Sequence, residues 1–402
     1  MKKVELLAPV RDLEQLKIAL NYGADSVYIG GEVLGMDDSN KSFSQEELIE
    51  GVKFAHEMGR RVYVTVNVLP HNEDFKNLDK YLLELEKAKV DAIIVVDPGV
   101  LSIAKKTVPN MEIHLGNQAN ITNYATANFW YKQGVKRVTM ARELSFKEMS
   151  DLKAKIPFDM EIEAFIHGPI CISYSGRRLI SNYLNARNNA NDDYTDVLDY
   201  NLIEEKRQGE YYPVYEDKRG TFFYNSKDLC MIEFIPELIK TGLSSLKIEG
   251  RMKSVYHLAS IVRAYKMAID EFYKNPKEWK FNESWLEDIK KGSTRDFTTG
   301  FYLDETVEYN YDDDKYSVIN LYDYIGIVSD IDKDGQALIK LKNDIKVGDV
   351  IEIMAPNKET MISKLEFILD ENGQSVDLAK ENQDIKIKLS LELEKGYMLR
   401  RE

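Results

Sequence analysis

The chain has 402 residues and a mass of 46.4 kDa, which exceeds one average domain and indicates a large domain with a smaller one attached. Its 54 basic and 68 acidic side chains leave a net charge of −14, which argues against broad, nonspecific nucleic-acid binding but allows a local basic groove. No apolar run is long enough to span a membrane, and the start MKKVELLAPV lacks the hydrophobic stretch of a secretion signal. With two cysteines and no export signal, the cytoplasm is the expected location.

Eight short segments rich in Val, Ile and aromatic residues alternate with helical patterns through about the first 250 residues. They begin at Val4, Ser26, Arg61, Ala92, Glu112, Arg137, Glu161 and Leu246. Strands and helices in this alternation predict a TIM-type (β/α)8 barrel over residues 1–275. The alternative is an open doubly wound sheet, but that fold usually has a glycine-rich first turn, whereas the first strand here ends in Ala8-Pro9-Val10-Arg11.

Capping signals mark the ends of several predicted helices. Ser44 is followed by Glu47, and Ser145 by Glu148, and this spacing opens helices through reciprocal hydrogen bonds. Four glycines lie shortly before the next strand, where a helix end requires a left-handed backbone: Gly23, Gly59, Gly134 and Gly242.

The connection after the seventh strand is much longer than the others. Residues 169–226 are predicted to be an insertion on the face of the barrel where the strands have their C-terminal ends. Long loops of this kind are usually lids or binding surfaces. Tyrosines and arginines alternate in this insertion, including Tyr174, Arg177 and Tyr183. Aromatic rings interleaved with arginines can stack bases, and the equally weighted alternative is that the tyrosines pack an irregular lid.

The chain ends in a different pattern. Residues 276–320 are predicted to be an acidic, tyrosine-rich connector. From about Tyr322 the hydrophobic period becomes two, in IGIVSDI, QALIKLK, DVIEIM and IKIKLSLEL, with a turn at Lys333-Asp334-Gly335. Residues 321–402 are therefore predicted to form a small, barrel-like all-β domain.

Functional side chains of such barrels come from the C-terminal ends of the strands. The polar residues at those ends are Asn67, Asp97, His114 to Gln118, Arg142, Glu143, His167, Glu249 and Arg251. Two guanidiniums at one mouth form a clamp for a carboxylate or a phosphate, which favours a pocket role for Arg142 and Arg251. For Asp97 and Glu143 the favoured interpretation is helix capping or pairing. No nucleophile elbow, zincin motif, phosphate loop or Cys-x-x-Cys pair is present in the sequence.

A set of motifs gives these positions a family context. The segment 163–184 reads EAFIHGPICISYSGRRLISNYL. It is accompanied by ELLAP near the start, GADSVYIGG at 23–31, ARELS at 141–145, NSKDLC at 225–230, SLKIEGRMKS at 245–254 and TTGFY at 298–302. Together these motifs closely resemble the signature of the collagenase-like peptidase family U32, and the resemblance covers nearly the whole chain.

The resemblance implies a (β/α)8 barrel and two competing activities. One is proteolysis. The other is oxygen-independent hydroxylation of the wobble uridine in tRNA, of a cytidine in large ribosomal RNA, or of a quinone ring. For the RNA-modifying members it implies prephenate as the source of the hydroxyl group and an iron–sulfur cluster on four cysteines. The layout here looks most like that of the tRNA hydroxylation members.

The resemblance and the strand ends together define the predicted site. The predicted catalytic residues are His167, Glu249 and Glu143. The predicted substrate-binding residues are Arg142, Arg177, Arg251, Asn117, Gln118 and Tyr174. The substrates implied are a small carboxylic acid and tRNA, and no membrane partner is expected.

The sequence departs from the family pattern at the cluster. Only Cys171 and Cys230 match ligand positions, and Arg178 stands where a further cysteine is expected. Four thiolates are the usual ligands, so the isolated chain is expected to carry no cluster and to act in RNA hydroxylation either alone or as the partner of a cluster-bearing paralogue. The alternatives are a peptidase, with Cys171 as a thiol nucleophile beside His167, and a non-catalytic binding paralogue.

Overall fold

The computed structural model of the chain describes residues 3–30, 43–175, 198–203, 211–217, 220–250, 253–303 and 322–402. The chain divides into two compact units. The first comprises Met1–Leu16, Asp25–Met252 and Arg295–Val318, and the second comprises Lys17–Ala24, Lys253–Thr294 and Ile319–Glu402. Among the described helices, none is both long and apolar enough to cross a membrane.

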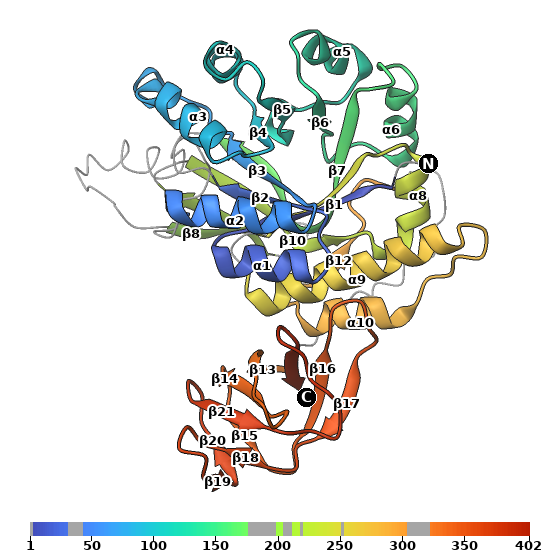
Figure 1. The fold of residues 1–402 in the computed structure, drawn as a ribbon. Coiled ribbons are helices and arrows are strands. Elements are labelled where there is room, and N and C mark those ends of the chain that lie inside the picture. Colours follow the sequence, from blue (N-terminus) through green and yellow to red (C-terminus); the bar gives the residue numbers. More distant parts are fainter. Residues whose placement is uncertain are drawn as a thin grey trace. The chain divides into compact units, whose positions relative to one another are not determined.

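Eight parallel strands close into a barrel in the first unit (Figure 1). They are β1 (Glu5–Val10), β2 (Ser26–Gly30), β3 (Arg61–Val66), β4 (Ala92–Val95), β5 (Glu112–Leu115), β6 (Arg137–Thr139), β7 (Glu161–Ser175) and β11 (Ser245–Ile248). The ring is complete because β11 pairs in parallel with both β1 and β7. The predicted (β/α)8 barrel is confirmed, and the open doubly wound sheet is excluded.

Helices connect the barrel strands in chain order. They are α1 (Leu13–Asn21), α2 (Gln45–Glu57), α3 (Leu78–Lys87), α4 (Pro98–Thr107), α5 (Tyr124–Lys132), α6 (Phe146–Lys153) and α8 (Ile235–Lys240), with short 3₁₀ turns η1 (Asn72–Phe75), η2 (Asn117–Ala119) and η3 (Ile232–Phe234). Both predicted capping boxes are present, at the starts of α2 and α6. The four predicted helix-end glycines all have positive φ, from +67° at Gly59 to +112° at Gly23.

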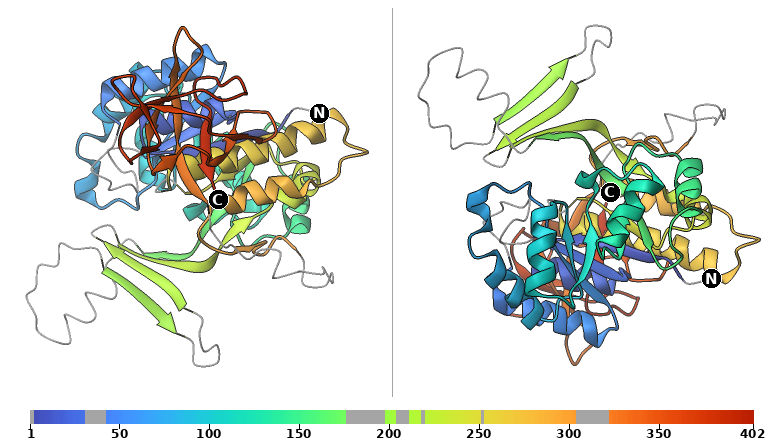
Figure 2. Two further views of the ribbon diagram at one scale, coloured as in Figure 1. Left: turned by 90° about the horizontal axis from the view of Figure 1, so that it is seen from below. Right: turned by 90° about the horizontal axis from the view of Figure 1, so that it is seen from above.

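The strand that bears the long insertion does not end at the barrel. β7 runs for 15 residues and continues into an antiparallel sheet with β10 (Gly220–Cys230), β9 (Tyr211–Asp217) and β8 (Leu198–Ile203). Figure 2 shows these strands leading away from the barrel. A short strand, β12 (Phe297–Thr298), pairs with β10. Where it is described, the predicted insertion 169–226 is therefore regular β-structure.

The second unit combines two helices with a β-domain. α9 (Val255–Lys274) and α10 (Glu283–Lys291) precede it, and α10 lies inside the stretch 276–320 that was predicted to be a connector. Eight strands form one antiparallel sheet in the order β17 (Met361–Lys364), β16 (Val350–Met354), β22 (Met398–Arg401), β13 (Asp323–Ile331), β14 (Ala337–Leu341), β21 (Asp384–Ile387), β18 (Ile368–Leu369) and β19 (Ser375–Val376). Two more strands, β15 (Ile345–Lys346) and β20 (Leu378–Ala379), pair separately. The domain is a half-barrel around a core of buried Ile, Leu and Val side chains.

Ion pairs join the helices and the sheet of the second unit. Asp288 of α10 accepts hydrogen bonds from Arg263 of α9 and from Arg400 of β22. The Nε of Arg400 also donates to Glu352 of β16 at 2.7 Å, and Glu352 accepts from Lys291 at 2.9 Å. Burial alone would raise the pKa of Asp288, but the two arginines outweigh it and lower that pKa.

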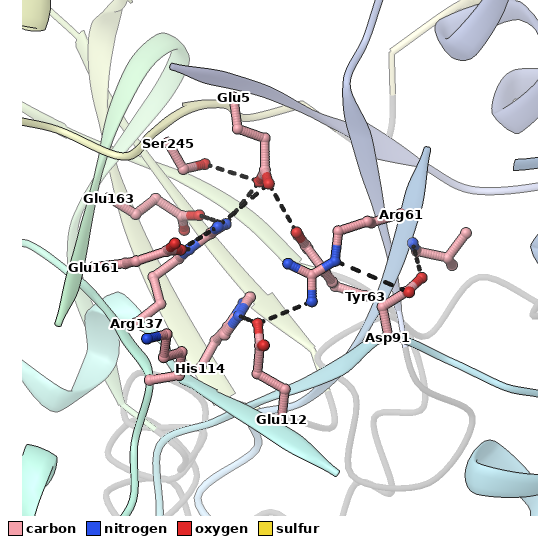
Figure 3. Close-up of polar contacts among 12 residues, drawn as sticks. Glu5, Arg61, Tyr63, Asp91, Glu112, His114, Arg137, Glu161, Glu163 and Ser245 are labelled. Atoms are coloured by element: carbon pink, nitrogen blue, oxygen red, sulfur yellow. Dashed lines mark hydrogen bonds and ion pairs between the residues drawn. The ribbon is translucent and has the colours of Figure 1, made fainter. Parts of the chain in front are cut away.

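The inside of the first barrel is charged at the N-terminal ends of its strands (Figure 3). The guanidinium of Arg137 on β6 is 3% exposed and donates to both oxygens of Glu5 on β1, at 2.6 and 3.2 Å. It also donates to Glu161 on β7, at 2.6 Å from Nη2 and 3.0 Å from Nε. The hydroxyl of Tyr63 on β3 donates to Glu5 at 2.8 Å. One guanidinium thus links three strands from within the barrel.

A third carboxylate lies deeper in this network. Glu163 of β7 is 2% exposed, and it accepts from Lys247 of β11 at 3.1 Å and from Thr139 of β6 at 2.9 Å. Burial by itself would raise the pKa of Glu163, but Lys247 and Arg137 outweigh that effect and lower it to about 2. The carboxylate is therefore ionised wherever the protein is folded at ordinary pH.

This lowered pKa predicts an acid-sensitive fold. A carboxyl group whose pKa is lower in the folded state stabilises the fold above its unfolded pKa, and this stabilisation is lost as the pH falls toward the folded value. Between about pH 4.5 and pH 2, Glu163 should contribute a loss on the order of 3 kcal/mol. In urea unfolding across this range, Glu163→Gln should flatten the pH dependence relative to wild type. The exposed Glu73→Gln should leave the slope unchanged, and equal slopes for wild type and Glu163→Gln would contradict the assignment.

Candidate functional site

The centre of the barrel mouth is an arginine held over an aromatic ring. Arg142 follows β6, and its guanidinium carbon lies 4.3 Å from the ring centroid of Phe165 on β7. Its Nη2 lies 3.9 Å from a carboxylate oxygen of Glu249, which follows β11. At this distance the ion pair is long, and the side chains are 12% and 28% exposed, so Glu249 holds Arg142 loosely. A carboxylate or phosphate that entered the mouth could take the place of Glu249.

A layer of aromatic and cationic side chains lies directly beneath Arg142. The Nζ of Lys247 sits 4.4 Å from the ring centroid of Tyr28 on β2 and 5.5 Å from that of Phe165. The hydroxyl of Tyr28 donates to the carbonyl of Ile248 at 3.0 Å and lies 3.4 Å from Glu249. The floor of the mouth therefore offers two ring faces and one ammonium group, all nearly buried.

Amide side chains from two other strand ends complete the polar rim. Asn67 follows β3 and is 8% exposed, and no described residue forms a hydrogen bond with its Oδ1. Asn117 and Gln118 lie half-buried in η2, after β5. A buried amide oxygen of this kind is suited to accept a hydrogen bond from a bound hydroxyl or amine.

His167 and Gly168 bring β7 and β11 together at the same level. His167 is 1% exposed, its ring lies 5.6 Å from that of Phe297, and its carbonyl accepts the Glu249 N–H at 2.8 Å. Gly168 has φ +103°, and a Cβ at this position would lie 2.3 Å from the Glu249 carbonyl oxygen. Only glycine allows this approach, which fixes where Glu249 leaves its strand.

The other predicted residues have different outcomes. Asp97 caps α4 by accepting from the N–H groups of Gly99 and Val100, as predicted. Glu143 is exposed in the turn after β6, while the partner of Arg142 is Glu249. Tyr174 lies in the β7 extension, opposite Phe222 of β10. Arg177 and Arg251 lie outside the described residues.

The placement of His114 at the mouth was wrong. His114 is buried inside the barrel, where its Nε2 lies 2.8 Å from Glu112 and its ring packs edge-on against Tyr63 at 4.7 Å. Burial lowers the pKa of His114, and its Nε2–H donates to the carboxylate of Glu112. Because β5 is only four residues long, the third residue still points into the base of the barrel.

Sequence reasoning missed three residues of the floor: Tyr28, Phe165 and Lys247. Each lies within a family motif, in GADSVYIGG, EAFIHG and SLKIEG respectively. Residues two apart on a strand face the same side, and Lys247 is two residues after the inward-facing Ser245, as Phe165 is two residues after the inward-facing Glu163. The alternation of inward-facing and outward-facing residues was therefore the sequence signal that could have identified these floor residues.

The two cysteines do not lie together. Cys230 is 1% exposed and pairs in register with His167, whereas Cys171 is four residues farther along β7. Four residues of strand correspond to about 13 Å. Across the described parts of the chain, no group of three or more His, Cys, Asp or Glu side chains could hold a metal ion. A cluster with four thiolate ligands does not fit this arrangement.

The cysteine geometry predicts the metal content of the purified chain. Prepared alone under anaerobic conditions, the protein should contain no stoichiometric iron or sulfide and should lack thiolate-cluster absorption near about 400 nm. Iron and sulfide analysis with absorption spectroscopy measures this. A full cluster in the isolated monomer would contradict it.

The close approach at Gly168 predicts a position-specific cost. Gly168→Ala should lower the free energy of unfolding by about 3 kcal/mol or more, because the new Cβ collides with the backbone at Glu249. Gly59→Ala is the matched control, since Gly59 also has positive φ but nothing lies within 4 Å of its Cβ position. That control should cost about 1–2 kcal/mol. Equal losses in urea unfolding would show that φ alone matters at Gly168.

Comparison with known proteins places this fold and mouth in a family. The chain is 37% identical over 404 residues to the tRNA hydroxylation protein P1 of Bacillus subtilis (strain 168), covering 100% of this chain and 95% of that protein. It is 34% identical to the uncharacterized protease MJ0090 of Methanocaldococcus jannaschii, covering 100% of this chain and 99% of that protein. It is 31% identical to the 23S rRNA 5-hydroxycytidine C2501 synthase of Escherichia coli (strain K12), covering 67% of this chain and 39% of that protein. Residues 11–310 match Peptidase family U32 and residues 320–400 match the Peptidase family U32 C-terminal domain, so the chain belongs to family U32.

Proposed function

We propose that this chain takes part in hydroxylating tRNA. The observation that carries the proposal is the full-length similarity to a tRNA hydroxylation protein, which extends over the barrel and the β-domain alike. The ribosomal RNA synthase, by contrast, aligns over only 39% of its own length, which favours the tRNA branch of the family.

The mouth is proposed to bind a small carboxylic acid of the prephenate type. Arg142 turns from Glu249 to the acid and makes a charge-assisted hydrogen bond. The rings of Phe165 and Tyr28 contact the apolar part of the ligand, and Asn67 accepts from a hydroxyl group. His167 and Glu249 are the proposed groups for moving a proton at the bound acid, with Glu143 at the outer rim.

A cluster-bearing paralogue is the proposed partner. The chain has only two cysteines, Cys171 on β7 and Cys230 on β10, and a cluster of this kind usually takes four thiolate ligands, so in this proposal the chain supplies the acid pocket and the partner supplies the redox centre. Formation of the complex would then be required for activity.

The peptidase alternative has less support from the geometry. The nucleophile of this alternative is Cys171, whose backbone lies four residues beyond His167 on β7, about 13 Å along the strand, which is longer than a contact between a base and its nucleophile. The archaeal relative is named as an uncharacterized protease, so proteolysis by this chain should also be tested. Digestion of gelatin by pure protein that disappears in Cys171→Ala would support the peptidase function.

The biological test uses the source organism. Deleting the gene should remove the hydroxylated wobble uridine from bulk tRNA, as measured by mass spectrometry of nucleosides, and a wild-type copy should restore it. Complementation by Arg142→Ala should fail while Lys395→Ala, an exposed residue of the β-domain, should succeed. An unchanged nucleoside profile after deletion would overturn the proposed function.

The chemical test measures the pocket directly. Arg142→Ala should weaken binding of prephenate by about ten- to a hundred-fold, because a charge-assisted hydrogen bond is removed. Arg142→Lys should recover only part of this affinity, since an ammonium group cannot form the two-pronged contact. Arg251→Ala, at the second predicted arginine of the clamp, should have an effect of similar size. Calorimetry on folded variants decides the question, and an affinity unchanged by Arg142→Ala would make this arginine structural.

A further inference from the structure

A second polar and aromatic surface lies on α5 and on the segment between α6 and β7, away from the mouth. Its exposed rings are Tyr124, Phe129 and Phe158, which are 45%, 55% and 99% exposed. Burial of a side chain of this size normally stabilises a fold, so a completely exposed phenyl group is unusual. No described neighbour covers Phe158, which is solvated on all sides.

Contacts join the two segments into one surface. The side chain of Asn128 donates to the carbonyl of Lys155 at 3.2 Å, and Tyr131 donates to the carboxylate of Asp159 at 2.9 Å. The ammonium of Lys155 lies 5.1 Å from the centroid of Tyr124. Figure 1 shows α5 and α6 as neighbours around the barrel. These contacts place α5 beside the segment 155–159, and Phe129 and Phe158 are exposed side chains of these two adjacent segments.

The charge of this patch opposes the charge of the chain. Residues 124–136 and 153–159 contain four lysines and one aspartate, although the whole chain has a net charge of −14. Those lysines are Lys132, Lys136, Lys153 and Lys155. Lys105 of α4 is added at the edge, where its ammonium donates to the carbonyl of Gln133. A local excess of lysines between exposed rings suits a polyanion that also presents flat apolar faces.

The distance between the patch and the mouth is short enough for one RNA molecule to contact both. The patch adjoins the start of β7 at Glu161, and the mouth lies near His167, six residues farther along the strand. This is about 20 Å of strand, and about 20 Å corresponds to roughly six base pairs of a double helix. A single RNA arm can therefore reach from one to the other.

We infer that this patch binds unpaired nucleotides of the tRNA substrate, with Phe158 and Phe129 stacking on bases and the lysines contacting phosphates. The inference rests on the proposed function, because it names a second contact for the same RNA. The lysines and exposed rings of the patch favour RNA, which offers phosphates and flat bases together. A protein partner would need a surface that is both acidic and apolar.

The experiment measures binding of unmodified tRNA transcript to the full chain over a range of salt concentrations. Phe158→Ala should weaken binding by about five- to a hundred-fold, because base stacking is lost, and should leave the salt dependence unchanged. Lys155→Ala should weaken binding and reduce the slope of log affinity against log salt by about 1. Helix α3 provides matched controls: Leu83→Ala, at a 48% exposed apolar residue, and Lys80→Ala should both bind like wild type.

Three results would overturn the inference. The first is no measurable affinity of the wild-type chain for tRNA. The second is wild-type affinity and salt slope in both patch variants. The third is unchanged tRNA binding with loss of binding to the cluster-bearing relative, which would assign the patch to a protein. Each leaves the nucleoside test of the proposed function standing, so the two can fail separately.

Discussion

The guanidinium of Arg137 is the interaction on which the barrel depends. It is almost completely removed from water, a state that is stable only when its donors are matched by carboxylates, and Glu5 and Glu161 supply them. These partners come from the first and seventh strands, so the charge network ties together strands that are far apart in the sequence. Removing Arg137 would leave the nearly buried carboxylates of Glu5 and Glu161 without their main counter-charge, which should strongly destabilise the fold.

The site is assembled on top of this charged base. Glu163 is shared between Arg137 below and Lys247 above, so the ammonium group that forms the floor of the mouth is positioned by the network. Lys247 in turn lies between the rings of Tyr28 and Phe165, and Phe165 carries Arg142. A short chain of contacts therefore connects the charged base to the mouth, and it ends at the long ion pair between Arg142 and Glu249.

Much of this could be predicted from the sequence, because strand order and helix caps follow from local patterns. The eight strands, the caps at Ser44 and Ser145, and the role of Asp97 were all predicted. The level of a side chain along the barrel axis was harder to predict, because alternation shows which side of the sheet a residue faces but not how far it lies from the mouth. His114 was therefore predicted at the mouth although it lies near the base, and Lys247 was missed. The partner of Arg142 also escaped, because Glu249 is brought to it by closure of the barrel rather than by sequence proximity.

The continuity of β7 has a mechanical consequence. One unbroken strand serves as a stave of the barrel in its first half and as a member of the antiparallel sheet in its second half. Its hydrogen bonds to β11 and to β10 meet at His167, so neither sheet can slide along β7 without straining the other. The position of the antiparallel sheet is thereby coupled to Glu249, whose N–H donates to the carbonyl of His167 at this junction.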